Sequence, residues 1–271
     1  RAEYIIARAL RTHFMHKPII EVQNISKRYR LGMIGSSTLK DTIHDLWNRW
    51  KYGKPPEPKN IIWALKDISL TVESGEIVGL IGRNGCGKST LLKILSRITD
   101  PTSGRAVLRG RSSTLLEVGT GFHYELSGRE NIYLNGAILG MRRKEIDRRL
   151  DEIIAFSEIE KFLDTPVKRY SSGMYVRLAF AVAAHLEQQI LMVDEVLAVG
   201  DRAFQEKCLT KTADMAEHGK TVVFVSHDLN AIQRLCHRCI YLKQGQIVMS
   251  GIPKDVIEVY QSTENYKPLA A

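Results

Sequence analysis

Residues 82–89 read GRNGCGKS and carry the first pattern in this chain that could do chemistry. The pattern fits G-x-x-x-x-G-K-[ST] at every fixed position and stands between an apolar run and a helical one. Glycines let the backbone fold tightly and point successive N–H groups at anionic oxygens, and a following helix adds the positive charge of its amino end. The loop therefore predicts a nucleotide site formed by Gly82, Arg83, Asn84, Gly85, Cys86, Gly87, Lys88, Ser89 and Thr90. Within it, Lys88 would reach the β- and γ-phosphates and the Ser89 hydroxyl would be a ligand for Mg²⁺.

A pair of acids follows the apolar run ILMV, where Asp194 and Glu195 come next. A buried strand that ends in an acid places it at the carboxyl edge of the sheet, where α/β folds hold their ligands. There Asp194 would hold Mg²⁺ and Glu195 would accept a proton from the attacking water. Without the phosphate loop, two solvated acids at an ordinary strand end would be the simpler interpretation.

His227 is a further candidate, because it closes the apolar run TVVFVS. A histidine at a strand end is more often structural than catalytic. If this strand lies in the same sheet and ends at the same edge, the imidazole would reach the γ-phosphate. We therefore predict His227 as a second catalytic residue beside Glu195.

The elements that position these side chains follow from periodicity. Runs at 76–82, 189–194 and 221–227 are continuously apolar, as in strands buried in a parallel sheet. From about 128 to 186 the period becomes helical. Further elements are expected as an edge strand at 18–29, a strand at 63–72, a short strand or hairpin at 104–111, a terminal hairpin at 239–251, and helices at 89–98 and 253–263. The predicted fold class is α/β: a P-loop NTPase core with a mainly parallel sheet, an N-terminal antiparallel β portion and an inserted α-helical subdomain.

Composition sets wider limits on the kind of protein. The chain has 271 residues, of which 44% are hydrophobic and 25% charged, as in ordinary globular proteins. No run approaches the roughly 18–20 apolar residues that cross a bilayer. The net charge of +9 permits nucleic acid, anionic lipid or polyanionic cargo as a partner. The stretch 142–152 alternates in sign and indicates a solvated helix face. Residues 1–14 are too charged for a secretory signal, and Met15 is an alternative start.

The four cysteines form no secreted disulfide framework in a chain of this length. Cys236 and Cys239 have the spacing of zinc ligands, but no second Cys or His pair accompanies them. The other interpretation is reduced thiols at a helix-to-strand junction, with Cys86 and Cys208 also reduced. Such thiols fit a cytosolic compartment.

The segment RYSSGMYVRLAF, residues 169–180, opens a helical run with two serines and a glycine. Taken alone, Ser172 would be an ordinary N-cap. The phosphate loop, YSSGM, ILMVDE, AVGD and a strand-terminal histidine, in this order, resemble the ATPase subunit of an ABC transporter. The resemblance covers about Ile19 to Gly251 and implies ATP and Mg²⁺ as cofactors.

YSSGM stands at the place of the family's LSGGQ-type signature and departs from it at the first, third and fifth positions. The resemblance implies that Ser171 and Gly173 contact phosphate, with Ser172 where glycine is usual, and that Asp201 is the acid of the D-loop. In this family two chains pair head-to-tail, and the signature helix of each meets the γ-phosphate held by the other. A homodimer with ATP between its chains is therefore expected.

Other family features concern adenine and the membrane partner. An aromatic after the first strand stacks on adenine in this family, and Tyr29 stands at that place, with Trp63 as the alternative; either could instead be core. The family's Q-loop glutamine has no counterpart in residues 115–131. Glu117 and His123 lie in that region without an assigned role.

Finer details, among them KRYRLG, the insertion after it and VDEVLAVGD, resemble a narrower subfamily. It exports lipid-linked polysaccharides, such as O-antigen or teichoic acid chains, across the bacterial cytoplasmic membrane. Leu31, Gly32 and the amphipathic stretch 37–50 resemble its loop and insertion near the membrane partner, where Trp47 and Trp50 would either dock or pack into a core. The resemblance implies a separate permease homodimer, with this chain peripheral at the cytoplasmic face in a 2+2 complex.

The expected organisation is an N-terminal extension at 1–17, an ATPase domain at 18–251, and a C-terminal helix and tail at 252–271. Within the domain, 31–60 is the subfamily insertion and about 122–186 is the helical subdomain with the signature. Some members append a carbohydrate-binding domain after the last helix. This chain leaves no room for one, so it is either a naturally short member or a shortened one.

Two other classes of function compete with this expectation. A soluble ABC-type ATPase acting on nucleic acid or ribosomes would fit the net charge, but such proteins usually carry two cassettes or a long coiled coil. A P-loop GTPase or kinase is the other class. No N-K-x-D base-reading motif occurs, and Glu195 directly after Asp194 argues against it. No specific nucleic acid partner is therefore expected.

Overall fold

The computed structural model describes residues 17–30, 61–114, 121–194 and 201–265. Within these ranges the strands form a three-stranded sheet, in the order β2-β1-β4, and a six-stranded sheet, in the order β5-β6-β7-β3-β8-β9. The smaller sheet is antiparallel and consists of β1 (Ile20–Arg30), β2 (Ile61–Val72) and β4 (Ser103–Leu108). The larger sheet consists of β3 (Ile77–Ile81), β5 (Ser112–Thr114), β6 (Ile190–Val193), β7 (Thr221–Val225), β8 (Arg238–Lys243) and β9 (Gln246–Gly251).

Parallel pairing dominates the larger sheet. β3 lies between β7 and β8 and is parallel to both, while β5, β6 and β7 are parallel neighbours. The exception is β9, which pairs with β8 in an antiparallel hairpin. This is the predicted α/β fold class, with the expected antiparallel portion near the amino end.

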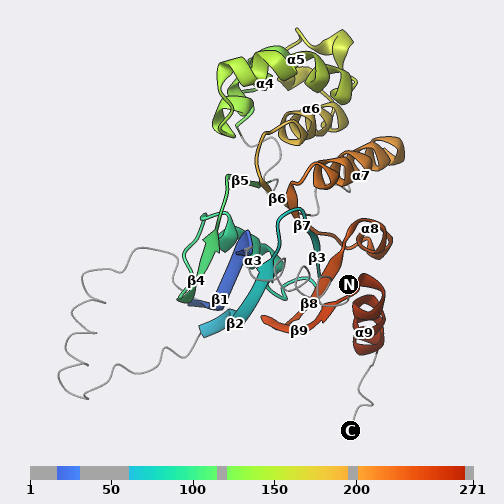
Figure 1. Ribbon diagram of the computed structural model, residues 1–271. Coiled ribbons are helices and arrows are strands. Elements are labelled where there is room, and N and C mark those ends of the chain that lie inside the picture. The colour runs from blue at the N-terminus through green and yellow to red at the C-terminus, as the bar shows by residue number, and fades with distance from the viewer. Residues whose placement is uncertain (1–16, 31–60, 115–120, 195–200, 266–271) are drawn as a thin grey trace, which may run out of the picture.

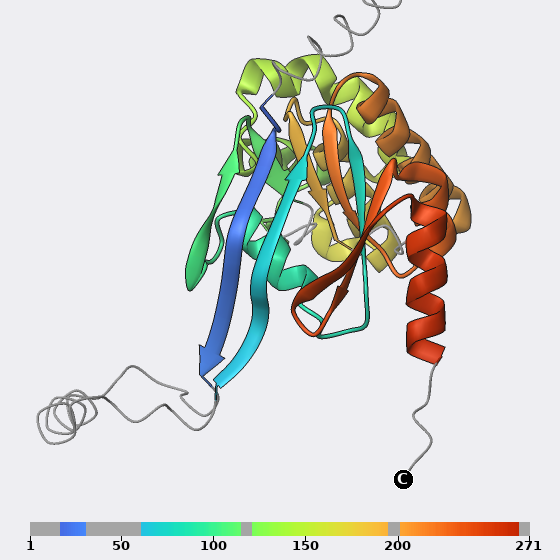
Figure 2. The ribbon, with the colours of Figure 1, turned by 60° about the horizontal axis from the view of Figure 1, so that its bottom comes forward.

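The helices of the described ranges form three groups (Figure 1). One helix, α3 (Lys88–Leu95), follows the phosphate loop and lies between the two sheets (Figure 2). A lobe at the top of Figure 1 holds α4 (Gly128–Ile138), α5 (Arg143–Ser157) and α6 (Ser172–Ala184), with single 3₁₀ turns at Glu160–Phe162 and Val167–Arg169. The other face of the larger sheet is covered by α7 (Arg202–Glu217), α8 (Leu229–Leu235) and α9 (Pro253–Asn265).

Alternate residues of the parallel strands serve two cores, because successive side chains of a strand point to opposite faces. Val78 and Leu80 pack with α3 and the antiparallel sheet, whereas Ile77 and Ile81 pack with the outer helices and the lobe. Strands buried on both faces must be apolar at every position. That requirement explains the continuous apolar runs from which the sheet was predicted.

The prediction of an edge strand at 18–29 is wrong. β1 is the central strand of its sheet, since Ile20 lies opposite Val72 of β2 on one side and Leu108 of β4 on the other. Its register shifts after Val22 on the β2 side and after Gln23 on the β4 side. Alternation in the sequence records which face is buried but not how many neighbours a strand has.

Two further expectations concern the surface and the membrane. The alternating charges of 142–152 lie on α5, whose buried positions include Ile146 and Ile153 and whose basic and acidic residues are mostly exposed, as predicted. None of the helices in the described ranges combines the length and hydropathy that a bilayer crossing requires. The insertion at 31–60, with Trp47 and Trp50, lies outside the described residues.

Candidate nucleotide site

The phosphate loop is pressed between the two sheets at two glycines. Gly82 has a φ of +146°, and a Cβ atom there would lie 2.2 Å from the carbonyl oxygen of Leu242 in β8. Gly87 has a φ of +114°, and a Cβ atom there would lie 2.5 Å from the carbonyl oxygen of Ala64 in β2. A side chain fits at neither position, so the fixed glycines of the motif have a steric cause.

Lys88 is buried at the first position of α3. Its Nζ donates to the carbonyl oxygens of Gly82 at 2.6 Å and Arg83 at 3.1 Å. These bonds satisfy a buried charge within the loop itself. The lysine is therefore held at the floor of the loop, beside the amino end of the helix.

The structure brings the other predicted groups together at this floor. Lys88, Ser89, Thr90, Asp194 and His227 line one pocket of about 320 Å³. The remaining wall comes from the loop and from β2, through Asn84, Gly85, Gly87 and Ala64. β6 ends at Val193 and β7 at Val225, so neighbouring parallel strands deliver the acid and the imidazole to the same edge, as the sequence predicted.

Ser89 and Asp194 are suited to a hard cation. The Ser89 hydroxyl donates to Asp194 Oδ2 at 3.4 Å. Burial raises the pKa of Asp194 above its ordinary value, although the bond from Ser89 and the charge of Lys88 act in the opposite direction. A carboxylate that is poorly solvated gains most from a cation beside it, and serine and aspartate oxygens are ligands that Mg²⁺ accepts.

His227 has a different electrostatic environment. Burial and, next, the positive charge of Lys88 lower the pKa of its imidazole below the usual value. The ring is therefore neutral at pH 7, with one nitrogen able to donate and the other to accept. Glu195, the predicted acceptor of the water proton, lies outside the described residues.

The signature residues lie at a second pocket. Ser171, Ser172, Gly173 and Met174 line it together with Glu158, Ile159, Arg177 and Asp201, and no residue belongs to both this pocket and the phosphate pocket. Figure 1 shows the same separation between α6 in the lobe and α3 beside the strands. The groups expected to contact phosphate in the signature are therefore apart from the phosphate loop of their own chain.

The helix cap differs by one residue from the simple interpretation. Ser171, not Ser172, is the N-cap of α6, and its hydroxyl oxygen accepts from the Met174 N–H at 3.2 Å. Ser172 is the first helical residue. Because Ser171 accepts in this bond, its own O–H remains able to donate to another oxygen.

Arg177 was not predicted from the sequence. It lies one turn along α6 and forms ion pairs with Glu158, at 2.7 Å, and with Asp201. Asp201 is also the N-cap of α7, where its carboxylate accepts from the Phe204 N–H at 2.9 Å. The predicted D-loop acid is thus fixed to the signature helix. An arginine on a helix surface gives no sequence signal of such a contact.

Tyr29 and Trp63 are each 42% exposed and line neither of these pockets. Trp63 directly precedes Ala64 of the phosphate pocket, whereas Tyr29 stands opposite Ile62, with the Lys27 ammonium 5.3 Å from its ring centre. The adenine contact stays a prediction for either residue. His123 lies near the start of the lobe, where its main-chain N–H donates to Asn131, and Glu117 lies outside the described residues.

The cysteines are free and buried. Cys236 is the C-cap of α8 and Cys239 lies in β8, which is the predicted helix-to-strand junction. Burial raises the pKa of the Cys239 thiol to about 12, and it raises the pKa of Cys236 further. Among the described residues no three His, Cys, Asp or Glu side chains are grouped as a metal site would need.

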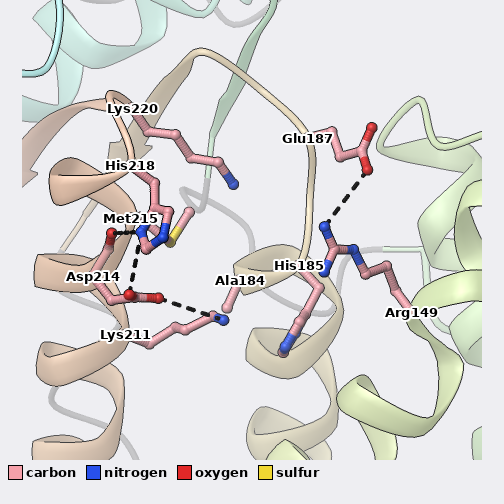
Figure 3. Close-up of a pocket in the computed structure, with 9 residues that line it drawn as sticks. All are labelled: Arg149, Ala184, His185, Glu187, Lys211, Asp214, Met215, His218 and Lys220. Atoms are coloured by element: carbon pink, nitrogen blue, oxygen red, sulfur yellow. Dashed lines mark hydrogen bonds and ion pairs between the residues drawn. The ribbon is translucent and has the colours of Figure 1, made fainter.

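A third pocket is rich in basic residues, and several of its basic side chains bond carbonyl groups of the protein itself (Figure 3). α6 and α7 both end at it, capped by His185 and His218. Nδ1 of His185 lies 2.7 Å from Ala181 O, and Lys220 Nζ donates to Leu186 O at 2.7 Å. His185 and His218 thus contact carbonyl groups in the last turns of α6 and α7, and Lys220 satisfies a carbonyl group just after α6. No predicted site residue lines this pocket.

Comparison with known proteins agrees with this geometry. The family model described as ABC transporter matches residues 65–198. The O-antigen export system ATP-binding protein RfbB of Klebsiella pneumoniae is 42% identical over 91% of this chain and 98% of its own length. This chain belongs to the ATP-binding proteins of ABC transporters. It is therefore an ABC-type ATPase, as the motif order predicted.

Other relatives refine the likeness to ABC proteins. RfbB of Myxococcus xanthus is 50% identical over 79% of this chain, which spans about half, 49%, of that protein. The teichoic acids export ATP-binding protein TagH of Listeria innocua is 43% identical over 89% of this chain and 69% of its own length. The dimeric ATP-binding cassette MJ0796, solved with ADP and phosphate, is 25% identical with a TM-score of 0.68, over 86% of this chain and 98% of that one.

The two signature serines differ in what their removal should do to this ABC ATPase. Ser171→Ala removes the N-cap of α6 and should lower the free energy of unfolding by about 1 kcal/mol. Ser172→Ala, the matched control, should change it by less than about 0.5 kcal/mol. Urea unfolding followed by circular dichroism measures both, and equal losses in the two variants would contradict the assignment of the cap.

Proposed function

We propose that this chain is the ATP-hydrolysing subunit of an exporter that moves a lipid-linked polysaccharide through a separate membrane permease. It acts as a head-to-tail homodimer, with ATP held between the phosphate loop of one chain and the signature helix of the other. The supporting observation is the separation of the two pockets. One holds Lys88, Asp194 and His227, and the other holds Ser171 and Gly173, each half of a complete site.

The phosphate pocket supplies binding and activation. Backbone N–H groups of the loop and the Lys88 ammonium hold the β- and γ-phosphates. Ser89 and Asp194 would hold Mg²⁺, which when bound neutralises charge on the phosphate oxygens. Glu195 accepts the proton of the attacking water. The neutral imidazole of His227 donates to a γ-phosphate oxygen.

The signature pocket completes the site from the partner chain. The free O–H of Ser171 and the amino end of α6 are both donors, and α6 presents no acidic side chain in its first turn. Such a helix end attracts a phosphate. Arg177 holds Asp201 against the same helix, so the D-loop acid and the signature approach the partner together.

The cargo is inferred from the relatives. Proteins named for O-antigen export and for teichoic acids export are similar to this chain over most of its length. An ATPase of this kind needs a permease, so we place the chain at the cytoplasmic face of the bacterial cytoplasmic membrane, peripheral to a permease homodimer in a 2+2 complex. Polysaccharide, not nucleic acid, is the proposed cargo.

Glu195→Gln should trap an ATP-bound dimer, because nucleotide binding survives while water activation is lost. Hydrolysis should fall by about a hundredfold or more. Light scattering after gel filtration in ATP and Mg²⁺ measures the mass. The same variant combined with Lys88→Ala is the control and should stay monomeric. A monomeric Glu195→Gln protein in saturating ATP would refute the shared site.

Gly173→Val tests the approach of the partner, because this chain has room for the change. A Cβ atom at Gly173 would meet only the Ser171 hydroxyl, at 3.9 Å. A single chain should therefore bind a fluorescent ATP analogue normally, whereas hydrolysis should fall by about a hundredfold from the misplaced helix end. Gly173→Ala should have a smaller effect. Full hydrolysis in the valine variant would contradict the placement of the signature.

The cargo is tested by reconstituting this chain in vesicles together with its proposed permease. Lipid-linked polysaccharide added to the vesicles should stimulate ATP hydrolysis, and the complex carrying Lys88→Ala should show no stimulation. Stimulation by duplex DNA or RNA instead, falling steeply with salt, would identify a nucleic-acid ATPase and overturn the proposal.

A further inference from the structure

The last turn of α9 lies behind the phosphate loop. Glu264 of this helix is only 15% exposed at its side chain, and its carboxylate contacts three groups. Oε1 accepts from the Tyr241 hydroxyl at 2.7 Å and lies 3.4 Å from Lys243 Nζ, both on β8. Oε2 lies 3.5 Å from the guanidinium of Arg83. One acid thus joins the C-terminal helix, the strand beside β3 and the loop.

The carboxylate is held firmly on the strand side. Tyr241 is fully buried, and the ring of Tyr260, also on α9, packs edge-on against it with centres 5.2 Å apart. The hydrogen bond from Tyr241 and, next, the charge of Lys243 lower the pKa of Glu264 below its usual value, against the effect of burial. The group is therefore a fixed anion at neutral pH.

The ion pair between Glu264 and Arg83 lies at a pocket between α9 and the phosphate loop. A pocket of about 340 Å³ separates the loop from α9, lined by Asn84, Gly85 and Cys86 on one side and by Thr263 and Glu264 on the other. Leu242, Lys243 and Gln244 also line this pocket, and the ion pair from Glu264 to Arg83 joins α9 directly to the loop. Arg83 is itself 75% exposed at its side chain, which leaves the pair open to weakening by salt.

The position of Arg83 matters for the site in front of the loop. Its carbonyl oxygen accepts from Lys88 Nζ at 3.1 Å and from the Cys86 N–H at 3.2 Å. A shift of Arg83 therefore moves an acceptor that holds the phosphate-binding lysine. A neighbouring main-chain bond, from the Gly245 N–H to Cys86 O at 2.9 Å, holds the middle of the loop but not Arg83.

We propose that Glu264 is a positioning residue for nucleotide binding, which acts through Arg83 to hold the first half of the phosphate loop. The C-terminal helix thereby sets the affinity for ATP rather than the rate of the chemical step. This inference rests on the proposed role of the loop in holding ATP. The alternative is a purely structural acid that fastens α9 to β8 through Tyr241 and Lys243.

The experiment compares variants by the Kd of a fluorescent ATP analogue, by kcat at saturating ATP and by thermal unfolding. Glu264→Gln should raise Kd about three- to fivefold and change kcat by less than twofold, as loss of a partly exposed ion pair would. Lys243→Gln, the matched control, removes a cation that lies at a similar distance from Glu264 but belongs to β8 and not to the loop, and its Kd should stay within twofold. In an Arg83→Gln background, Glu264→Gln should have no further effect on Kd.

The contrary results are distinct. Equal changes of Kd in Glu264→Gln and Lys243→Gln, or a full effect of Glu264→Gln in the Arg83→Gln background, would overturn the inference in favour of the structural acid. The variant Lys88→Ala distinguishes failure of this inference from failure of the proposed ATP site. If Lys88→Ala weakens binding and Glu264→Gln does not, only this inference fails; if Lys88→Ala binds normally, the proposed site fails. If Glu264→Gln does not fold, Arg83→Gln is measured alone. An unchanged Kd in Arg83→Gln would then overturn the inference about Glu264.

Discussion

The phosphate loop lies close to two carbonyl oxygens, one from each sheet, and this close approach constrains how the two sheets pack. Ala64 O belongs to the antiparallel sheet and Leu242 O to the parallel one, and the loop passes both at glycines where a Cβ atom would clash. The site therefore exists only when both sheets and α3 between them are packed. Neither sheet alone would fix the loop, which is why the buried side chains of α3 contact both. A substitution that loosens the core between the two sheets would therefore also displace the phosphate loop.

The larger sheet was predictable because its strands are buried on both faces, and such strands leave continuous apolar runs in the sequence. The convergence of Asp194 and His227 then followed, since parallel strands end at one edge. The place of β1 did not follow, because its partner β4 lies about eighty residues further on and pairing leaves no local trace. The cap of α6 was missed by one residue for a related reason: both serines suit an N-cap, and only the hydrogen bond to Met174 distinguishes them.

Long-range ion pairs were invisible in the sequence. Arg177 with Asp201, and Arg83 with Glu264, each join residues on separate elements, and neither pair has a periodic or motif signature. In each pair one residue, Asp201 or Arg83, belongs to a predicted motif, and its partner lies outside that motif. Motifs therefore identified the groups that would meet ATP, whereas the contacts that hold those groups emerged only from packing. Residues with a defined chemistry were easier to find than residues that position them.

The net charge of +9 suggested an anionic partner, but the structure shows that several basic side chains bond groups of the protein itself. In the basic pocket between α5, α6 and α7, His185 and His218 contact carbonyl groups at the ends of α6 and α7. Lys220 donates to Leu186 O, and Arg149 and Lys211 face Glu187 and Asp214. The proposed affinity for phosphate instead rests on main-chain N–H groups of the loop, the amino end of α3 and the buried ammonium of Lys88. Those groups contribute little to the formal charge. The formal net charge therefore does not by itself locate the anion site.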